Sequence, residues 1–181
     1  GEVAAAGRSK APSAEAGGAG AAEDASAAAS ASSGEGGAGA ALSSSGAVPV
    51  EVVQAARRGD EVVVLAWLED GGRGDAAFEY VFSNGPVSGV TLLMVAMTYG
   101  HEGLAEALLQ RGADVLLQTS KGTNALMGAA ANGFVKLLEL ALRHGAEINE
   151  RNGSHCITAL MGAATNGHEN IVHALIRHGA D

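Results

Sequence analysis

The sequence predicts an all-α repeat solenoid, because one segment of it occurs twice. Residues 124–149, NALMGAAANGFVKLLELALRHGAEIN, return with few changes as residues 158–181, TALMGAATNGHENIVHALIRHGAD. A segment that recurs at a fixed period is typical of structural units that stack on one another. The period extends upstream, since four glycines recur at steps of 41, 33 and 34 residues: Gly59, Gly100, Gly133 and Gly167. We therefore expect four stacked units.

The first 46 residues differ in composition from the rest. Only ten of them are not Ala, Gly or Ser, and just two, Val3 and Leu42, are aliphatic residues larger than alanine. Such a segment buries too little apolar surface to offset its ordering entropy. We predict a disordered tail at 1–46 and a repeat domain at 47–181, with units near 47–85, 86–118, 119–151 and 152–181. The tail has more acids than bases, which argues against an organelle transit peptide.

Each unit is predicted to be a pair of short helices. In the first unit Pro49 suits a helix start, Gly59 separates the two helices, and Asp60 places an acid at the beginning of the second. A closing glycine follows each mid-unit glycine by twelve residues: Gly71, Gly112, Gly145 and Gly179. Isolated helices below ~12–15 residues are marginal in water. Their stability must therefore come from stacking.

Small and aliphatic residues at equivalent positions predict how the units pack. The pairs Ala129-Ala130 and Ala163-Ala164 would let neighbouring backbones approach closely. Larger aliphatic residues would fill the layer between units: Leu104, Leu108, Leu109, Leu137, Leu138, Leu142, Ile171, Val172, Leu175 and Ile176. Three methionines share one repeat position, Met94, Met127 and Met161, which favours core packing over an adaptable recognition groove.

The eight extra residues after the first unit predict a lengthened hairpin within residues 73–88. Phe78, Tyr80 and Phe82 alternate as on one face of a strand, and Asn84-Gly85 is a turn dipeptide. The aromatic face would either fold onto the adjacent helices, which we favour because exposed aromatic patches are hazardous, or accept a partner peptide by strand addition.

The repeated motifs resemble the ankyrin repeat family over residues 50–181. Thr91-Leu92-Leu93-Met94-Val95-Ala96 and its copies at 124–130 and 158–164 match the family's TPLHxAA motif. Gly100-His101 and Gly167-His168 match its GH motif, with Gly133-Phe134 as a variant, and the segments after each closing glycine match GADVN. The proline of TPLH is missing and methionine replaces its histidine, so we expect somewhat softer repeats. The first unit lacks the motif, as a divergent capping repeat would. The resemblance implies helix–turn–helix units joined by β-hairpin fingers.

The resemblance also implies recognition of a protein partner by a concave strip, formed by the fingers and the inner helices. Mapped onto this chain, it gives these candidate partner-binding residues: Arg57, Arg58, Tyr80, Thr98, Tyr99, Lys121, Ala131, Asn132, His155, Thr165 and Asn166. Tyr99 and the arginine pair are the preferred anchors by residue type. We expect a non-catalytic protein–protein interaction scaffold or adaptor. The alternative is a substrate-targeting module of a larger enzyme, such as a kinase or ubiquitin ligase.

Other functions are disfavoured by composition. The net charge of −9 leaves Arg57-Arg58 as the one adjacent basic pair, which speaks against nucleic acid as the main partner. Each histidine has a repeat position that explains it, and the single cysteine, Cys156, has no second cysteine with which to build a zinc site. We expect no cofactor, metal, catalytic residue or membrane span, and a monomer in the cytoplasm or nucleus. The end at Asp181, inside a finger, suggests that the sequence is truncated.

Overall fold

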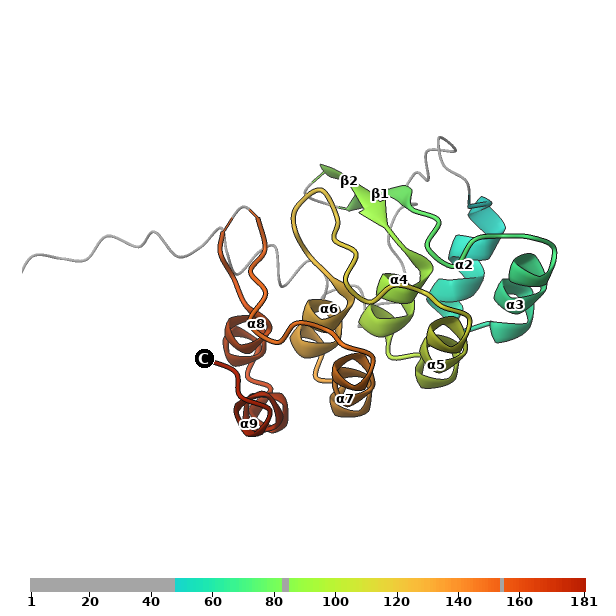
Figure 1. Cartoon of the computed structure of the whole chain (residues 1–181). Helices are drawn as coiled ribbons and strands as arrows, with labels where there is room; N and C mark the ends of the chain where they lie inside the picture. Colours follow the sequence, from blue (N-terminus) through green and yellow to red (C-terminus); the bar gives the residue numbers. More distant parts are fainter. Residues whose placement is uncertain (1–47, 83–84, 154) are drawn as a thin grey trace, which may run out of the picture.

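A computed structural model describes residues 48–82, 85–153 and 155–181. The expected disorder of the tail at 1–46, the Asn84 turn position and Ser154 lie outside these residues. Four consecutive helix pairs stack side by side within the described part (Figure 1). The predicted repeat solenoid is confirmed.

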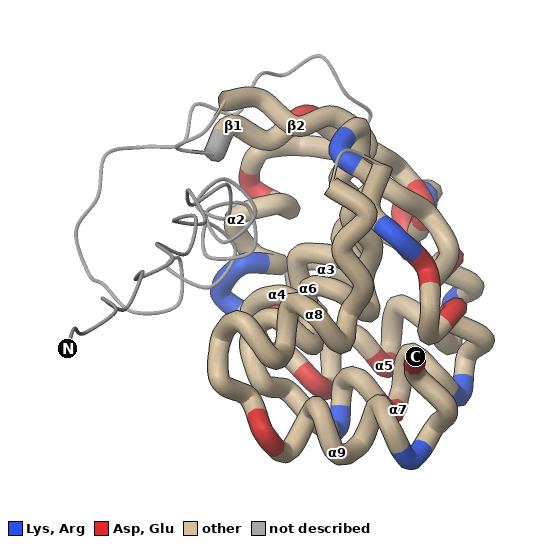
Figure 2. Tube along the Cα trace, turned by 90° about the vertical axis from the view of Figure 1, so that its left-hand side faces the viewer, with Lys and Arg blue, Asp and Glu red and all other residues tan. Residues whose placement is uncertain are grey.

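The helices form two parallel rows. The inner row contains α2 (Val50–Arg58), α4 (Leu92–Tyr99), α6 (Ala125–Ala131) and α8 (Ala159–Thr165). The outer row contains α3 (Glu61–Glu69), α5 (Glu102–Gln110), α7 (Val135–Arg143) and α9 (Glu169–Arg177). Each inner helix contacts the next inner helix and its own outer partner. Figure 2, viewed along the stack, shows the two rows below the hairpin.

Short polar side chains begin the inner helices of the last three units. The side-chain oxygens of Thr91, Asn124 and Thr158 each accept a hydrogen bond from the backbone N–H three residues later. Such a cap satisfies a backbone donor that has no partner inside the helix. In the first unit, α2 ends at Arg58 and is followed by Gly59, whose φ of 74° lies in the left-handed region that favours glycine. The sequence thus sets both ends of these short helices.

The core is a continuous layer between the units. Most of the predicted aliphatic residues are buried, with Leu104, Leu108, Leu138, Ile171 and Leu175 at 0% exposure. Ala129 and Ala130 are also fully buried, between the neighbouring inner helices α4 and α8. Burial of this kind, at roughly 25 cal/mol per Å² of apolar surface, stabilises helices that would not form alone.

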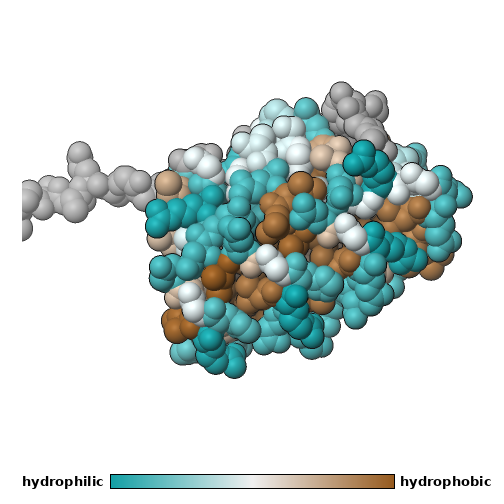
Figure 3. All heavy atoms as spheres, in the orientation of Figure 1, coloured by the Kyte–Doolittle hydropathy of each residue, from teal (hydrophilic) through white to brown (hydrophobic). Residues whose placement is uncertain are grey.

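The last unit departs from this pattern. Met94 and Met127 are buried, but Met161 is 52% exposed and Ile176 is 55% exposed. Ala164 is exposed as well, so the expectation that all three methionines, Ala164 and Ile176 fill the core is wrong for this unit. The reason is that no described helix covers α8 and α9 on their far side (Figure 1). Figure 3 shows apolar atoms at the surface near both ends of the stack and also across the middle of the visible face.

The lengthened first finger is an antiparallel hairpin, as predicted. Strand β1 (Phe78–Phe82) pairs with β2 (Gly85–Val90), with Tyr80 opposite Val87 and an irregularity between Phe78 and Tyr80. The side chains of Phe78 and Tyr80 are buried at 5% and 6% exposure. Phe78 and Tyr80 therefore fold down onto the array, and their burial does not support strand addition onto that face.

The fingers stack on one another above the inner row (Figure 1). Ser120 of the second finger donates its backbone N–H to the carbonyl of Ser88, and its Oγ accepts from the N–H of Ser88. The two later fingers have no strand among their described residues. They are closed instead by backbone hydrogen bonds from Thr119 to Thr123 and from Asn152 to Ile157.

Candidate functional site

A cluster of one cation and two aromatic rings lies where α2, β1 and α4 meet. The guanidinium carbon of Arg57 is 5.3 Å from the ring centroid of Tyr99 and 5.9 Å from that of Tyr80. Both distances are in the range of cation–π attraction. The ring of His101 stacks on Tyr99 with a centroid separation of 6.4 Å and an interplanar angle of 11°. We call Arg57, Tyr80 and Tyr99 the aromatic clamp.

The clamp depends on a tie between the first two units. Nε2 of His101 donates to the backbone carbonyl of Arg57 at 2.7 Å, which fixes the end of α2 against the second unit. The imidazole also fills the space beside Gly59, where a Cβ would lie 2.6 Å from His101 Nδ1. His101 is therefore a structural residue, as its repeat position predicted.

The tyrosine of β1 differs electrostatically from a solvent-exposed one. Burial raises the pKa of Tyr80 to about 12, Tyr99 adds to this rise, and the positive charge of Arg57 opposes it. The phenol of Tyr80 is therefore neutral at physiological pH. Tyr80 was predicted as a partner-binding residue, but its side chain is almost fully buried. Its ring instead packs against the guanidinium of Arg57.

The arginine has unused hydrogen-bonding capacity. Its Nε–H is buried and has no hydrogen-bond partner among the residues that the structure describes. In the same part of the chain, no salt bridge joins a carboxylate to Arg57 or to its exposed neighbour Arg58. Buried polar groups usually have a partner, so such an exception calls for an explanation.

The third and fourth units use several predicted contact residues internally. Ala131 is only 5% exposed, so the expectation that its side chain faces outward is wrong. The following unit covers it, since Asn166 Nδ2 and His168 Nε2 both donate to the Ala131 carbonyl at 2.9 Å. Asn132 donates to the carbonyl of Gly128 at 2.9 Å and so caps its own helix. Both asparagines are half-buried.

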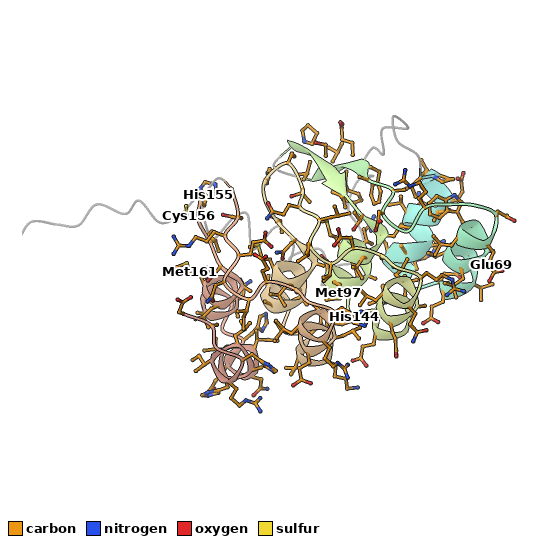
Figure 4. All side chains as sticks on the ribbon, viewed as in Figure 1. Glu69, Met97, His144, His155, Cys156 and Met161 are labelled. Carbon is orange, nitrogen blue, oxygen red and sulfur yellow. The ribbon has the colours of Figure 1, made fainter. Side chains whose placement is uncertain are left out.

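The remaining candidates lie on the surface or near it. Thr98 is half-buried beside Tyr99, and Thr165 is exposed on α8, where its hydroxyl donates to the carbonyl of Met161. Lys121 is half-buried in the second finger, at residues 119–123. His155 is exposed at the tip of the last finger beside Cys156 (Figure 4). These positions follow the stack, and among them Arg57 contacts Tyr80 and Tyr99, and Asn166 donates to the Ala131 carbonyl.

Charge is distributed unevenly between the two rows. Helices α4, α6 and α8 have no charged residue, and α2 has Glu51 at its start and Arg57 and Arg58 at its end. The acids of the array concentrate on the outer helices and the links: Glu61, Glu69, Glu102, Glu106, Glu139, Glu147, Glu150 and Glu169. Figure 2 shows the basic segment beside α2 apart from most of the red acidic segments. The inner surface thus contains a local positive site on an acidic molecule.

The described residues contain no group of three or more His, Cys, Asp or Glu side chains arranged to hold a metal ion. In the same ranges, 48–82, 85–153 and 155–181, no helix has the length and apolar character needed to cross a membrane.

Comparisons with known proteins agree with this architecture. Residues 93–181 match the family described as ankyrin repeats (3 copies). A mouse protein, "Protein fem-1 homolog A-like" from Mus musculus, is 40% identical over 65 residues, which are 36% of this chain and 10% of that protein. The match thus covers about a tenth of the relative's length.

The fold and the repeated inner surface define a class of protein, the helical repeat solenoids. Within this class, residues 93–181 are ankyrin repeats, the family whose model they match. Ankyrin repeats generally mediate protein–protein interactions, and such repeat domains are typically non-catalytic.

Sequence reasoning identified Arg57 and Tyr99 but missed their contact. The two residues are separated by the whole second helix and the hairpin, so no local spacing brings them together. The signals that could have indicated it are the similar positions of the two residues, two before Gly59 and one before Gly100, and the alternation that turns Tyr80 toward the helices. Stacked units bring equivalent positions side by side.

Proposed function

We propose that this chain is a non-catalytic scaffold or adaptor that binds a partner protein through its inner surface. By inner surface we mean the exposed side chains of α2 and α8, the half-buried Thr98, Tyr99 and Asn132 at the ends of α4 and α6, and the fingers. The observation that supports this proposal best is the aromatic clamp, in which an arginine and a tyrosine from adjacent units are held together at the surface. Arginine and tyrosine are among the residues enriched in binding hot spots.

The stacked alanines give this surface its rigidity. Ala129 and Ala130 are fully buried between neighbouring inner helices, so the inner row has little freedom to rearrange. A pre-formed surface loses less conformational entropy on binding than a flexible one. The outer row is less suited to this role, because its exposed face is strongly charged and its only described ion pairs lie at the surface.

The test is partner capture with variants of the full chain. Tyr99→Ala removes the half-buried ring of the clamp, and Asn132→Ala changes the inner row one unit further along. Arg143→Ala, on exposed outer helix α7, is the matched control. Partners identified with the wild-type chain should be lost with Tyr99→Ala and weakened with Asn132→Ala, while Arg143→Ala retains them. Undiminished recovery by both inner variants, in chains with wild-type thermal midpoints, would overturn the proposal.

A second candidate is a substrate-targeting module of a larger enzyme, a kinase or a ubiquitin ligase. The observation that favours it is the length of the mouse relative, of which the matched segment forms only 10%. The two candidates share the same binding surface and differ in what else the polypeptide contains. Determination of the complete reading frame distinguishes them, since a catalytic domain in the same frame supports the second.

A further inference from the structure

The arginine pair at the end of α2 is a cationic site that has no counter-charge among the residues that the structure describes. Arg57 is half-buried and Arg58 is exposed, and no described salt bridge involves either. The nearest helices of the inner row offer no acid, because α4, α6 and α8 are uncharged. A partly buried charge that lacks a partner costs free energy, which an opposite charge from a ligand would offset.

The site is also held in a fixed orientation. Tyr80 and Tyr99 place their rings 5.9 Å and 5.3 Å from the Arg57 guanidinium carbon, and His101 fixes the Arg57 carbonyl from the next unit. Arginine presents its donors in a planar fork that matches a carboxylate. Since the guanidinium is already positioned, little side-chain entropy is lost when it binds.

We propose that Arg57 and Arg58 bind the carboxylate side chains of an acidic, extended peptide segment of the partner protein. This inference rests on the proposed function and names the chemistry that the inner surface selects. The neighbouring Thr98 and Tyr99 continue the contact along the row with a hydroxyl and an aromatic ring. The segment thus crosses the inner helices at their ends, beside the mid-unit glycines.

A peptide is favoured over nucleic acid by the charge of the whole chain. Phosphate backbones need several basic groups along a continuous path, whereas this molecule has a net charge of −9 and one adjacent basic pair. Two arginines suffice for one or two carboxylates. Acids on the outer helices α3 and α5 would also repel a longer polyanion.

A direct test uses two labelled peptides and the full chain. A fluorescein-labelled peptide of four consecutive glutamates flanked by glycines is titrated by fluorescence anisotropy beside the same peptide with glutamine at each position. We expect the glutamate peptide to bind at least about tenfold tighter and to weaken as salt is raised, as a charge-assisted contact does. Equal affinity for the two peptides, or no binding of either, would overturn the inference.

Matched variants locate the contact. Arg58→Gln, at an exposed position that the clamp does not need, should weaken the glutamate peptide at least about threefold. The double variant Arg57→Gln/Arg58→Gln should lose at least about tenfold, and Arg143→Gln, which removes one charge from the outer row, should stay within about twofold. Loss of the same size in Arg143→Gln and Arg58→Gln would show a general charge effect and sink the proposal.

Two further measurements separate recognition from folding and from nucleic acid. The Nε–H resonance of Arg57, followed by NMR in the wild-type chain, should shift on addition of the glutamate peptide and stay fixed with the glutamine peptide. A single-stranded RNA oligonucleotide that displaces the glutamate peptide at equal concentration would replace this proposal with nucleic-acid binding.

Failure here and failure of the proposed function give different results. Suppose that partner proteins are captured by Arg57→Gln/Arg58→Gln as well as by the wild type, and are lost with Thr165→Arg at the far end of the inner row. The inner surface then binds proteins without the arginine pair, and only the acidic-peptide inference falls. If both variants still capture the partner proteins, the result counts against the proposed function itself.

Discussion

Asp75 Oδ1 accepts a hydrogen bond from the backbone N–H of Asp114 at 2.7 Å, which joins the link after the first unit to the link after the second. The same tie recurs between the last two units, where Asn149 Oδ1 accepts from the N–H of Asp181 at 3.1 Å. Asp75 and Asn149 each follow a closing glycine by four residues. Leu116 occupies this position in the second unit, where it is 46% exposed and has no side-chain acceptor.

Leu116→Asn should therefore stabilise the array. The new amide oxygen can accept from the backbone N–H of Glu147, the residue equivalent to Asp114 and Asp181, and little apolar burial is lost. A net hydrogen bond contributes about 0.5–1.5 kcal/mol, and we expect a gain in this range from urea unfolding. Leu116→Ala is the control, because it removes the leucine without adding an acceptor. Equal stability of the two variants would show that the tie does not form.

Ala130→Leu should destabilise the chain by about 1–3 kcal/mol, because the added atoms have no space between the packed inner helices. Ala130 is 0% exposed. Ala164, its equivalent in the fourth unit, is exposed, so Ala164→Leu should change the free energy of unfolding by less than about 0.5 kcal/mol. Chemical denaturation of the two variants tests the pair. A similar loss in both would mean that α8 is also covered.

The sequence predicted the repeat period, the helix pairs and the hairpin, because glycines, caps and alternating aromatics are local signals. It did not predict which face of the last unit would be exposed, since Met127 and Met161 have nearly the same local sequence and differ in what lies beyond them. The same limit applies to Ala131, which is covered by side chains from the next unit. Burial in a solenoid depends on the neighbouring repeat.

The sequence predicted only some of the contacts among the inner-surface candidates, because these contacts also depend on the neighbouring repeat. Arg57 and Tyr99 have the residue types of binding anchors, and the structure places them together at 5.3 Å. The internal roles of Asn132 and Asn166 follow from hydrogen bonds to backbone carbonyls, which residue type alone does not reveal. Polar residues at a repeat's turn serve both contact and capping, and only the geometry separates these uses.

Cys156→Gly should stabilise the last finger. Cys156 has a φ of 53°, and it lies two residues before a helix cap, at the position that Gly89 and Gly122 occupy with φ of 79° and 77°. The left-handed conformation costs an L-residue roughly 1–2 kcal/mol. Glycine has greater conformational freedom in the unfolded chain, which reduces the gain in stability by about 0.4–1 kcal/mol. A net gain of about 0.5–1 kcal/mol should appear in urea unfolding.

The matched control for this prediction is Gly122→Ala. It introduces the same kind of strain in the third unit, and its Cβ would overlap the backbone nitrogen of Gly153 in the next finger. We expect a loss of about 1–3 kcal/mol. Unchanged or lower stability of Cys156→Gly, together with this loss, would show that the cysteine side chain makes a compensating contact.

Tyr80→Phe should reduce the loss of stability at high pH. The pKa of Tyr80 is raised to about 12 by burial, above the 10.0 of an ordinary tyrosine. Between these values the unfolded chain has released the proton and the folded chain still holds it, so stability falls as pH rises through this window. Below pH about 10 the Tyr80 hydroxyl is protonated in both the folded and the unfolded chain, so its contribution to stability is fully present. A difference of two units corresponds to about 3 kcal/mol at most.

Urea unfolding of the wild type and Tyr80→Phe at pH about 8, about 10 and about 11 measures this effect. Other groups titrate in both proteins, so the informative quantity is the difference between their unfolding free energies. That difference should be constant up to pH about 10 and then change in favour of the phenylalanine variant, which has no hydroxyl to ionise. A difference that stays constant to pH about 11 would show that the Tyr80 hydroxyl ionises equally in the folded and unfolded chains.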